Sequence, residues 1–192
     1  MYALALVPVL FGLPSLCGLI DRQFPHLIVP VDKSRPNVAI NTQKSFDIER
    51  DIYTEFLFDV PASSGAFCDL RLTINTEPNR GAPWQIWGPA EPFVFNVSTV
   101  SRPINKDKDT WSNHPAIKDW VATYRVYKNG HVEQIGGQYF QCAKGNVSEF
   151  IAHPVDLTRE GGLKFYELDE PLHGFTYEAF ALDTPVKPSQ SA

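Results

Sequence analysis

The sequence has little positive charge and few of the residue patterns on which catalysis depends. Among its 192 residues, 17 lysines and arginines face 22 acidic residues, and the formal net charge is −5 at pH 7. This charge argues against nucleic acid and against an anionic membrane as partners. No G-x-S-x-G motif is present, which excludes a serine nucleophile of that type. Heptad and internal repeats are missing too, which excludes a coiled coil and a repeat array.

Metal-ligating residues are also sparse and badly spaced. The histidines are scattered along the chain, at His26, His114, His131, His153 and His173, and no pair has the spacing of a zinc site. The segment 106–109 (KDKD) contains a D-x-D element, but the glycine and distal glutamate of a calcium-binding loop are missing. We interpret this segment as a solvated loop and predict neither a metal site nor a cofactor.

What the sequence does have is an apolar leader over residues 1–17, without a charged side chain. Prolines and glycines interrupt it, and Asp21 and Arg22 follow soon after. Its length and breaks are typical of a cleaved secretion signal rather than of a membrane span. Small residues, Ser15 and Cys17, stand where signal peptidase requires them. We therefore expect cleavage after Cys17 and a secreted, extracellular product. A buried N-terminal segment of a cytosolic domain is the alternative.

Removal of the leader leaves two cysteines, Cys68 and Cys142. In an oxidising compartment such a pair predicts one disulfide, which would stabilise the fold by about 2–4 kcal/mol. Two N-x-S glycosylation acceptors, at Asn96 and Asn146, agree with a eukaryotic secretory route.

Alternation of apolar and polar side chains predicts a series of short strands. The clearest are 52–60, 68–74, 93–100, 163–168 and 174–182. We expect 52–60 and 68–74 to pair as a hairpin, because the residues between them (PASSG) favour a turn. Asn129-Gly130 predicts a second hairpin within residues 120–135.

Two segments differ from this pattern. Residues 113–120 suggest one short helix. Residues 77–92 combine four prolines with Trp84 and Trp87, which is too much proline for a central strand, so we expect an ordered surface loop there.

These elements predict an all-β fold, namely a single-domain antiparallel β-sandwich, jelly-roll-like, with at most one short helix. A closed barrel is the alternative architecture. The expected organisation is a secretion signal at 1–17, a short N-terminal linker at 18–25, the β-sandwich domain at 26–182 and a disordered tail at 183–192. Both Cys68 and Cys142 are expected to point inward from strands.

Five stretches are distinctive when they are taken in order. They are residues 26–31 (HLIVPV) with Pro36, residues 56–61 (FLFDVP), Cys68 with Leu70, Cys142 with Gly145, and a closing set of Leu163, Phe165, Tyr166, Pro171 and Gly174. Together they resemble a fungal family named for the C-terminal domain of the ubiquitin 3 binding protein But2, over most of residues 26–180.

The resemblance implies a secreted or cell-surface fungal β-domain with no established enzymatic activity. The family's name implies binding to a component of the pathway that activates a ubiquitin-like modifier, but that pathway is intracellular and a secreted chain would not meet it. The segment 77–92 departs from the family's serine- and threonine-rich composition, and the resemblance supplies no binding residues for this chain.

Two groups of carboxylates would suit a hydrolase. One comprises Asp47, Glu49 and Asp51, and the other comprises Glu167, Asp169 and Glu170. A pair of catalytic acids needs carboxyl groups about 5–10 Å apart in a cleft. Among 22 acidic residues, near neighbours also arise without a site, so we favour a solvated surface.

The candidate ligand-binding residues are Trp84 and Trp87, joined by Trp111, because aromatic faces stack on sugar rings. Packing of these tryptophans against a sheet edge is the competing interpretation.

The sequence thus favours a secreted fungal module without catalysis, which binds or has a structural role at the cell surface or wall. Its partner would be a cell-wall glycan or an extracellular protein, and no membrane contact is expected after signal cleavage. A secreted hydrolase with paired carboxylates is one alternative, and a binder of a ubiquitin-like modifier-activating enzyme is the other.

Overall fold

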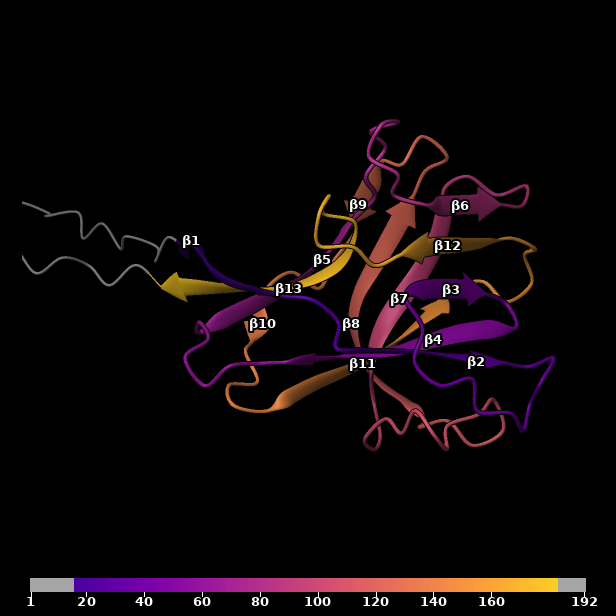
Figure 1. Cartoon of the computed structure of the whole chain (residues 1–192), viewed down its shortest axis with the longest axis horizontal. Coiled ribbons are helices and arrows are strands. Elements are labelled where there is room, and N and C mark those ends of the chain that lie inside the picture. Colours follow the sequence, from indigo (N-terminus) through magenta and orange to yellow (C-terminus); the bar gives the residue numbers. More distant parts are fainter. Residues whose placement is uncertain (1–15, 183–192) are drawn as a thin grey trace, which may run out of the picture.

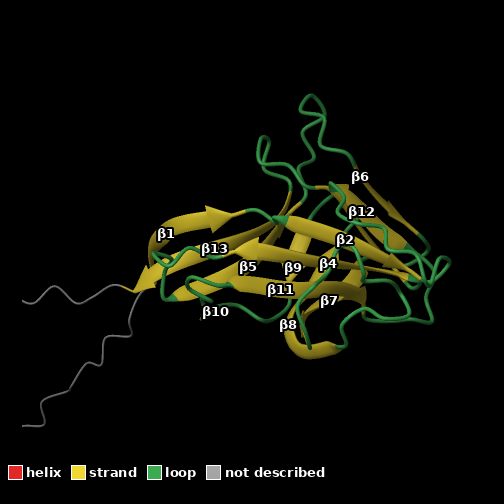
Figure 2. Ribbon diagram, turned by 60° about the horizontal axis from the view of Figure 1, so that its bottom comes forward, coloured by secondary structure: helices red, strands yellow, loops and turns green. Residues whose placement is uncertain are grey.

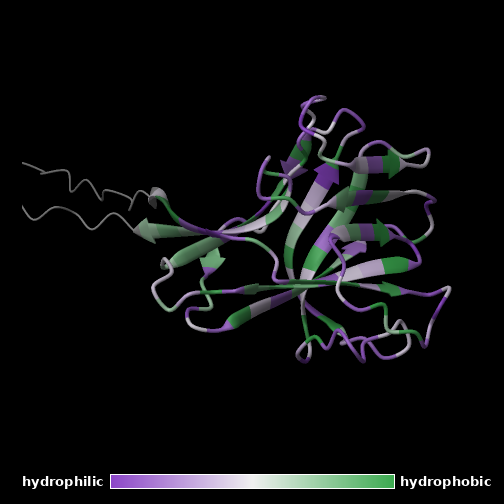
Figure 3. Ribbon diagram, viewed as in Figure 1, coloured by the Kyte–Doolittle hydropathy of each residue, from purple (hydrophilic) through white to green (hydrophobic). Residues whose placement is uncertain are grey.

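A computed structural model of the chain describes residues 16–182. In this range thirteen strands form two antiparallel sheets that pack as a sandwich, and no helix occurs (Figures 1 and 2). Bands of apolar and polar residues alternate along many strands, as half-buried strands require (Figure 3). The predicted all-β antiparallel sandwich is therefore confirmed.

The smaller sheet has four strands and the larger has nine. The small sheet runs in the order β1 (Leu16–Gln23), β13 (Gly174–Leu182), β5 (Phe67–Thr73) and β10 (Phe140–Gln141). The large sheet runs β6 (Trp84–Trp87), β12 (Gly162–Tyr166), β3 (Ser45–Glu49), β4 (Ile52–Asp59), β11 (Val147–Pro154), β7 (Phe93–Val100), β8 (Ile117–Val126) and β9 (Val132–Gln134), and β2 (Leu27–Asp32) pairs with β4.

A threonine side chain helps the large sheet to curl strongly between β3 and β4. Strand β2 occupies the edge of β4 along Ile52–Leu57, whereas β3 meets β4 in register only at Glu49 and Ile52. Further along, the buried Thr54 hydroxyl accepts from the Asp47 amide at 3.0 Å and donates to the Asp47 carbonyl at 2.6 Å. This side chain replaces a backbone pair, so β3 leaves the plane of β4 without losing its hydrogen bonds.

Aromatic rings build the core between the sheets, and Phe175 of β13 lies at its centre. Its buried ring contacts Phe56 and Phe46 at centroid distances of 5.0 and 5.2 Å. Tyr124 and Phe165 lie 5.5 and 5.9 Å away. These partners come from β4, β3, β8 and β12. One side chain of the small sheet thus packs against four strands of the large sheet.

Only one of the two predicted hairpins forms. Residues Tyr127–His131 connect β8 to β9, with Gly130 at φ 84° and its amide donating to the Tyr127 carbonyl at 2.8 Å, as the Asn-Gly signal indicates. The hairpin of 52–60 with 68–74 is wrong. Strand β4 belongs to the large sheet and β5 to the small one, so the turn at 61–65 carries the chain across the sandwich.

Three further local expectations differ from the structure. The helix expected at 113–120 is wrong, because β8 begins at Ile117 and pairs with β7, with Ile117 opposite Val100. The surface loop expected at 77–92 contains the short edge strand β6, whose flanking prolines Pro83 and Pro89 lie outside the pairing. Residues 18–25 were expected to be a linker, but most of them belong to β1, which pairs with β13.

The expected secretion signal and tail fall mostly on residues 1–15 and 183–192, which lie outside the described residues. Within residues 16–182, no helix is long and apolar enough to cross a membrane.

The predicted disulfide joins Cys68 to Cys142, with their Cα atoms 5.1 Å apart. Both cysteines are buried, as expected. Cys68 lies in β5, and Cys142 directly follows β10, which pairs with β5 at only two positions. The bond therefore holds the shortest strand of the small sheet against its neighbour.

Replacing the central ring tests this description of the core. We expect Phe175→Ala to lower the free energy of unfolding by about 3–5 kcal/mol, because it leaves a cavity among the surrounding rings. Tyr166→Ala is a matched control in an exposed position, 42% accessible, and should change stability by less than about 0.5 kcal/mol. Urea unfolding followed by tryptophan fluorescence measures both. Equal losses in the two variants would contradict the central position of Phe175.

Candidate functional site

A loop covers the centre of the outer face of the large sheet, the face that points away from the small sheet. This loop, residues 101–116, connects β7 to β8 and is called the β7–β8 loop below. Val29, Val31 and Ile151 are fully buried although they do not belong to the core between the sheets. The Ser112 amide donates to the Pro36 carbonyl at 2.9 Å and ties the loop to the segment after β2. A second, smaller buried region therefore exists on the outer face.

Strand pairing places polar side chains within this region. Glu55 of β4 lies opposite Ile151 of β11, which lies opposite Ser98 of β7. Tyr53 and His153 meet beside this row, with ring centroids 5.9 Å apart. An acid, a hydroxyl, a phenol and an imidazole are thus gathered on one covered face.

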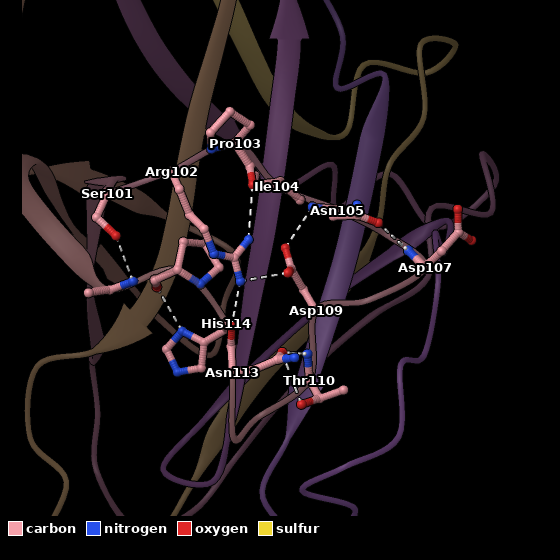
Figure 4. Close-up of polar contacts among 12 residues, drawn as sticks. Ser101, Arg102, Pro103, Ile104, Asn105, Asp107, Asp109, Thr110, Asn113 and His114 are labelled. Carbon is pink, nitrogen blue, oxygen red and sulfur yellow. Dashed lines mark hydrogen bonds and ion pairs between the residues drawn. The ribbon is translucent and has the colours of Figure 1, made fainter.

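Glu55 and Asp109 form a buried acid pair beneath the loop. Glu55 has no accessible surface and Asp109 has 1%. Arg102 Nη2 lies 2.8 Å from Asp109 Oδ1 (Figure 4). Neither carboxyl oxygen of Glu55 accepts a hydrogen bond from the described residues. Arg102 pairs with Asp109, whereas Glu55 has no such partner among the described residues, so burial favours its neutral form.

The pKa of Glu55 is raised by its surroundings. Burial raises the pKa of Glu55 to about 8, and the negative charge of Asp109 is the next cause. Arg102 acts in the opposite direction, and the charge of Glu149 raises the pKa further. At neutral pH Glu55 is therefore a neutral, buried acid.

The acids hold the β7–β8 loop in place. Asp109 Oδ2 accepts from the Asn105 amide at 2.6 Å, and Glu149 Oε1 accepts from the Ile104 amide at 3.0 Å. Figure 4 shows the Arg102 side chain reaching across the loop to both Asp109 and the Asn113 carbonyl. Glu55 and Asp109 are therefore buried structural acids beneath the loop, rather than an open reaction centre.

A serine and histidine pair lies under the same cover. Ser98 Oγ and His153 Nε2 are 3.2 Å apart, and burial lowers the pKa of His153. A neutral imidazole next to a hydroxyl is the chemistry of an activated nucleophile. Ser98 is only 3% exposed, however, so no substrate reaches this hydroxyl while the loop is in place.

Trp111, the third predicted ligand-binding tryptophan, belongs to this covered region. Its ring packs against Tyr53 at a centroid distance of 4.8 Å, and Lys33 Nζ lies 6.0 Å from the ring centre. Trp111 is half-buried and helps to close the loop over the sheet.

Trp84 and Trp87 are separated by their strand. They lie three positions apart in β6, so their side chains leave opposite faces of the sheet. Trp84 packs against the core. Trp87 lies over Gly162, where an added Cβ would come within 2.4 Å of the indole, and it borders a pocket of about 270 Å³ with Glu160. The structure therefore does not combine the predicted tryptophans into one platform.

The three carboxylates of the first predicted group have different surroundings, although Glu49 and Asp51 border the same pocket. Asp47 pairs with Lys164 at 2.9 Å. Burial raises the pKa of Glu49, whereas a hydrogen bond from Lys33 lowers that of Asp51.

The carboxylates of the second group also differ in their surroundings. Burial raises the pKa of Glu167 to about 9, and this residue borders a pocket of about 410 Å³ with Asp169. Glu170 is exposed and pairs with Arg80 at 2.6 Å. The two groups border different pockets, and the described residues contain no set of three or more side chains placed to hold a metal ion.

An open groove that the sequence patterns did not reveal lies beside Trp120. It has a volume of about 450 Å³ and is called the Trp120 groove below. It forms where β11 separates from β7: their pairing ends at Phe150 and Thr99, while β11 continues along β4 to Val147. The chain entering β10 closes its other side, with Tyr139 in its wall. The groove thus opens where the two sheets meet.

Trp120 is the most exposed of the four tryptophans, at 53%, and Tyr139 is 39% exposed. Sequence reasoning passed over Trp120, which lies at the end of the expected helix and at the start of the expected hairpin, because only the tryptophans of the proline-rich segment and Trp111 were considered as a platform. Strict alternation would have placed Trp120 on the buried face with Ala122, Tyr124 and Val126. The pairing of β7 with β8 is irregular between Ala122 and Trp120, and the indole is exposed instead, which no local sequence pattern signals.

The two glycosylation acceptors differ in their surroundings. Asn146 is exposed in the turn before β11, whereas Asn96 is half-buried in β7 and its Oδ1 accepts from the Thr123 hydroxyl at 2.6 Å. Asn96 lies on the outer face, as its register predicts, but the β7–β8 loop buries the neighbouring Ser98.

Comparison with known protein families identifies one family model that matches most of the chain. The family model described as the ubiquitin 3 binding protein But2 C-terminal domain matches residues 23–171. No curated protein matches the chain.

Within the matched range, two of the family motifs meet in space. His26 Nδ1 of the opening motif lies 2.5 Å from Asp59 Oδ2 of the 56–61 motif, because β2 and β4 are neighbours.

The acid pair predicts how stability depends on pH. The pKa of Glu55 is about 8 in the folded chain and about 4.3 when unfolded, so the native state binds the extra proton between these values. The contribution of Glu55 to the free energy of unfolding is therefore complete below pH 4. It is lost as the pH rises towards about 8, and the free energy falls by at most about 1.4 kcal/mol per pH unit. We expect Glu55→Gln to remove this part of the pH dependence.

Chemical denaturation between pH 5 and 8 measures this effect. Glu160→Gln, at an exposed position, is the matched control and should retain the wild-type slope. Parallel curves for wild type and Glu55→Gln would contradict a protonated Glu55.

Proposed function

The chain belongs to the family of the ubiquitin 3 binding protein But2 C-terminal domain, and on this basis we propose that it is a secreted module without catalysis that binds a partner at the fungal cell surface or wall. The family's name describes binding by the protein But2 and assigns no partner to this chain.

The observation that carries the proposal is the contrast between the sealed acids and the open groove. Glu55, Asp109, Ser98 and His153 are the groups best suited to chemistry, and the β7–β8 loop covers them. The Trp120 groove is open and presents aromatic rings and amides, together with the carboxylates of Asp119 and Glu149, of which Glu149 already accepts from the Ile104 amide. An accessible aromatic groove supports recognition, while the inaccessible acids give hydrolysis no support.

Three features support an extracellular location. The apolar leader has the composition of a secretion signal. The Cys68–Cys142 disulfide suits an oxidising compartment. Asn146 is exposed, as a glycan acceptor must be.

Sedimentation with wall material tests the binding function. The secreted protein is expected to begin near Gly18 on N-terminal sequencing and to co-sediment with an insoluble fungal wall preparation. A second preparation stripped of protein separates the partner classes: retention on both indicates a polysaccharide, and retention on the native wall alone indicates a protein. Retention on neither, or failure to be secreted, would contradict the proposal.

A further inference from the structure

The indole of Trp120 is held in a fixed orientation by its neighbours. Its Nε1–H donates to Thr123 Oγ1 at 2.9 Å, and that hydroxyl donates in turn to Asn96 Oδ1 at 2.6 Å. The far edge of the ring lies against Gly136, where an added Cβ would come within 3.0 Å. With its polar edge and its tip fixed, the ring remains 53% exposed. This is a preorganised apolar surface, which loses little entropy when a ligand binds.

Tyr139 is held in the groove wall at a conformational cost. Its φ is 52°, in the left-handed region that non-glycine residues rarely occupy, and its ring packs edge-on against Phe180 at 5.5 Å. Gly137, at φ 78°, passes so close to Val121 that an added Cβ would lie 1.6 Å from the carbonyl oxygen. Strain that persists in a ligand-sized groove points to a function for that geometry.

The polar lining of the groove suits a neutral ligand with many hydroxyl groups. Gln138 and Gln141 are exposed, and each amide offers donors and an acceptor, as hydroxyl groups require. The lining includes two carboxylates, Asp119 and Glu149, but no lysine, arginine or histidine. An anionic polymer would therefore be repelled.

The carboxylates are also partly engaged, which disfavours a cationic ligand. Glu149 already accepts from the Ile104 amide at 3.0 Å, and Lys118 Nζ lies 3.5 Å from Asp119. Aromatic faces, amides and a lack of free positive charge together describe a site for sugar rings, whose C–H faces pack on aromatic rings while their hydroxyls pair with amides.

We propose that the Trp120 groove binds a neutral polysaccharide, with sugar rings packed on Trp120 and Tyr139 and hydroxyl groups paired with Gln138 and Gln141. The inference rests on the proposed binding function and names the ligand class of the same site.

Titration calorimetry of the mature secreted protein tests this. The probes are laminarihexaose and chitohexaose as neutral oligosaccharides, a heparin hexasaccharide as an anion and hexalysine as a cation. We expect one of the neutral probes to bind best. Trp120→Ala should weaken that binding about tenfold or more, as expected for a lost aromatic stacking contact. Trp120→Phe, which keeps an aromatic face, should lose less, and Trp87→Ala is the matched control that should bind normally.

Several outcomes would overturn the inference. They are no binding of either neutral probe at millimolar concentration, tighter binding of hexalysine or heparin, or neutral binding that survives in folded Trp120→Ala. Because Trp120 is exposed, circular dichroism should show the variant folded. Retention on native wall without affinity for the neutral probes would refute the inference and leave the proposed function standing, whereas loss of all wall retention refutes both.

Discussion

The ring of Phe175 is buried inside the curled large sheet and joins the two sheets of the sandwich. The sheet can close around this ring because Thr54 lets β3 turn away from β4. The contact fixes the small sheet against the large one, and the Tyr124 hydroxyl adds a hydrogen bond across the interface to the Leu70 carbonyl of β5. Because the inner face of the large sheet packs against the small sheet, only its outer face remains available to the β7–β8 loop and to ligands.

The outer face of the large sheet has a centre that is covered by the β7–β8 loop and a margin that is open at the Trp120 groove. At its centre, the β7–β8 loop buries Glu55, Asp109 and Ser98. At its margin, β7 and β11 part and expose Trp120 and Tyr139. Glu149 links the two regions, because it anchors the loop through Ile104 and also lines the groove. Rigidity of the loop thus contributes to the shape of the groove.

Sequence patterns predicted the strands and the turn whose conformation is set by residues close to one another in the chain. Alternation indicated β4, β5, β7 and β13, and Asn129-Gly130 specified its turn locally. The partner of β4 was not predictable in this way, because strand pairing is set by packing across the sandwich. Burial of Glu55 was hidden for the same reason, since its cover comes from a distant loop. The tryptophans were chosen by composition, which favoured Trp84 and Trp87 and passed over Trp120. The family motifs, such as His26 and Asp59, describe the scaffold rather than the groove.

Nuclear magnetic resonance would show directly where an oligosaccharide binds. Amide and indole signals of the isotope-labelled mature protein would be followed during addition of whichever neutral hexasaccharide binds. The account predicts shifts at the Trp120 indole and at the amides of Gln138, Tyr139 and Gln141, with the signals of Trp87 and Trp111 unchanged. Shifts centred on Trp87 or on the β7–β8 loop, with Trp120 unaffected, would contradict it.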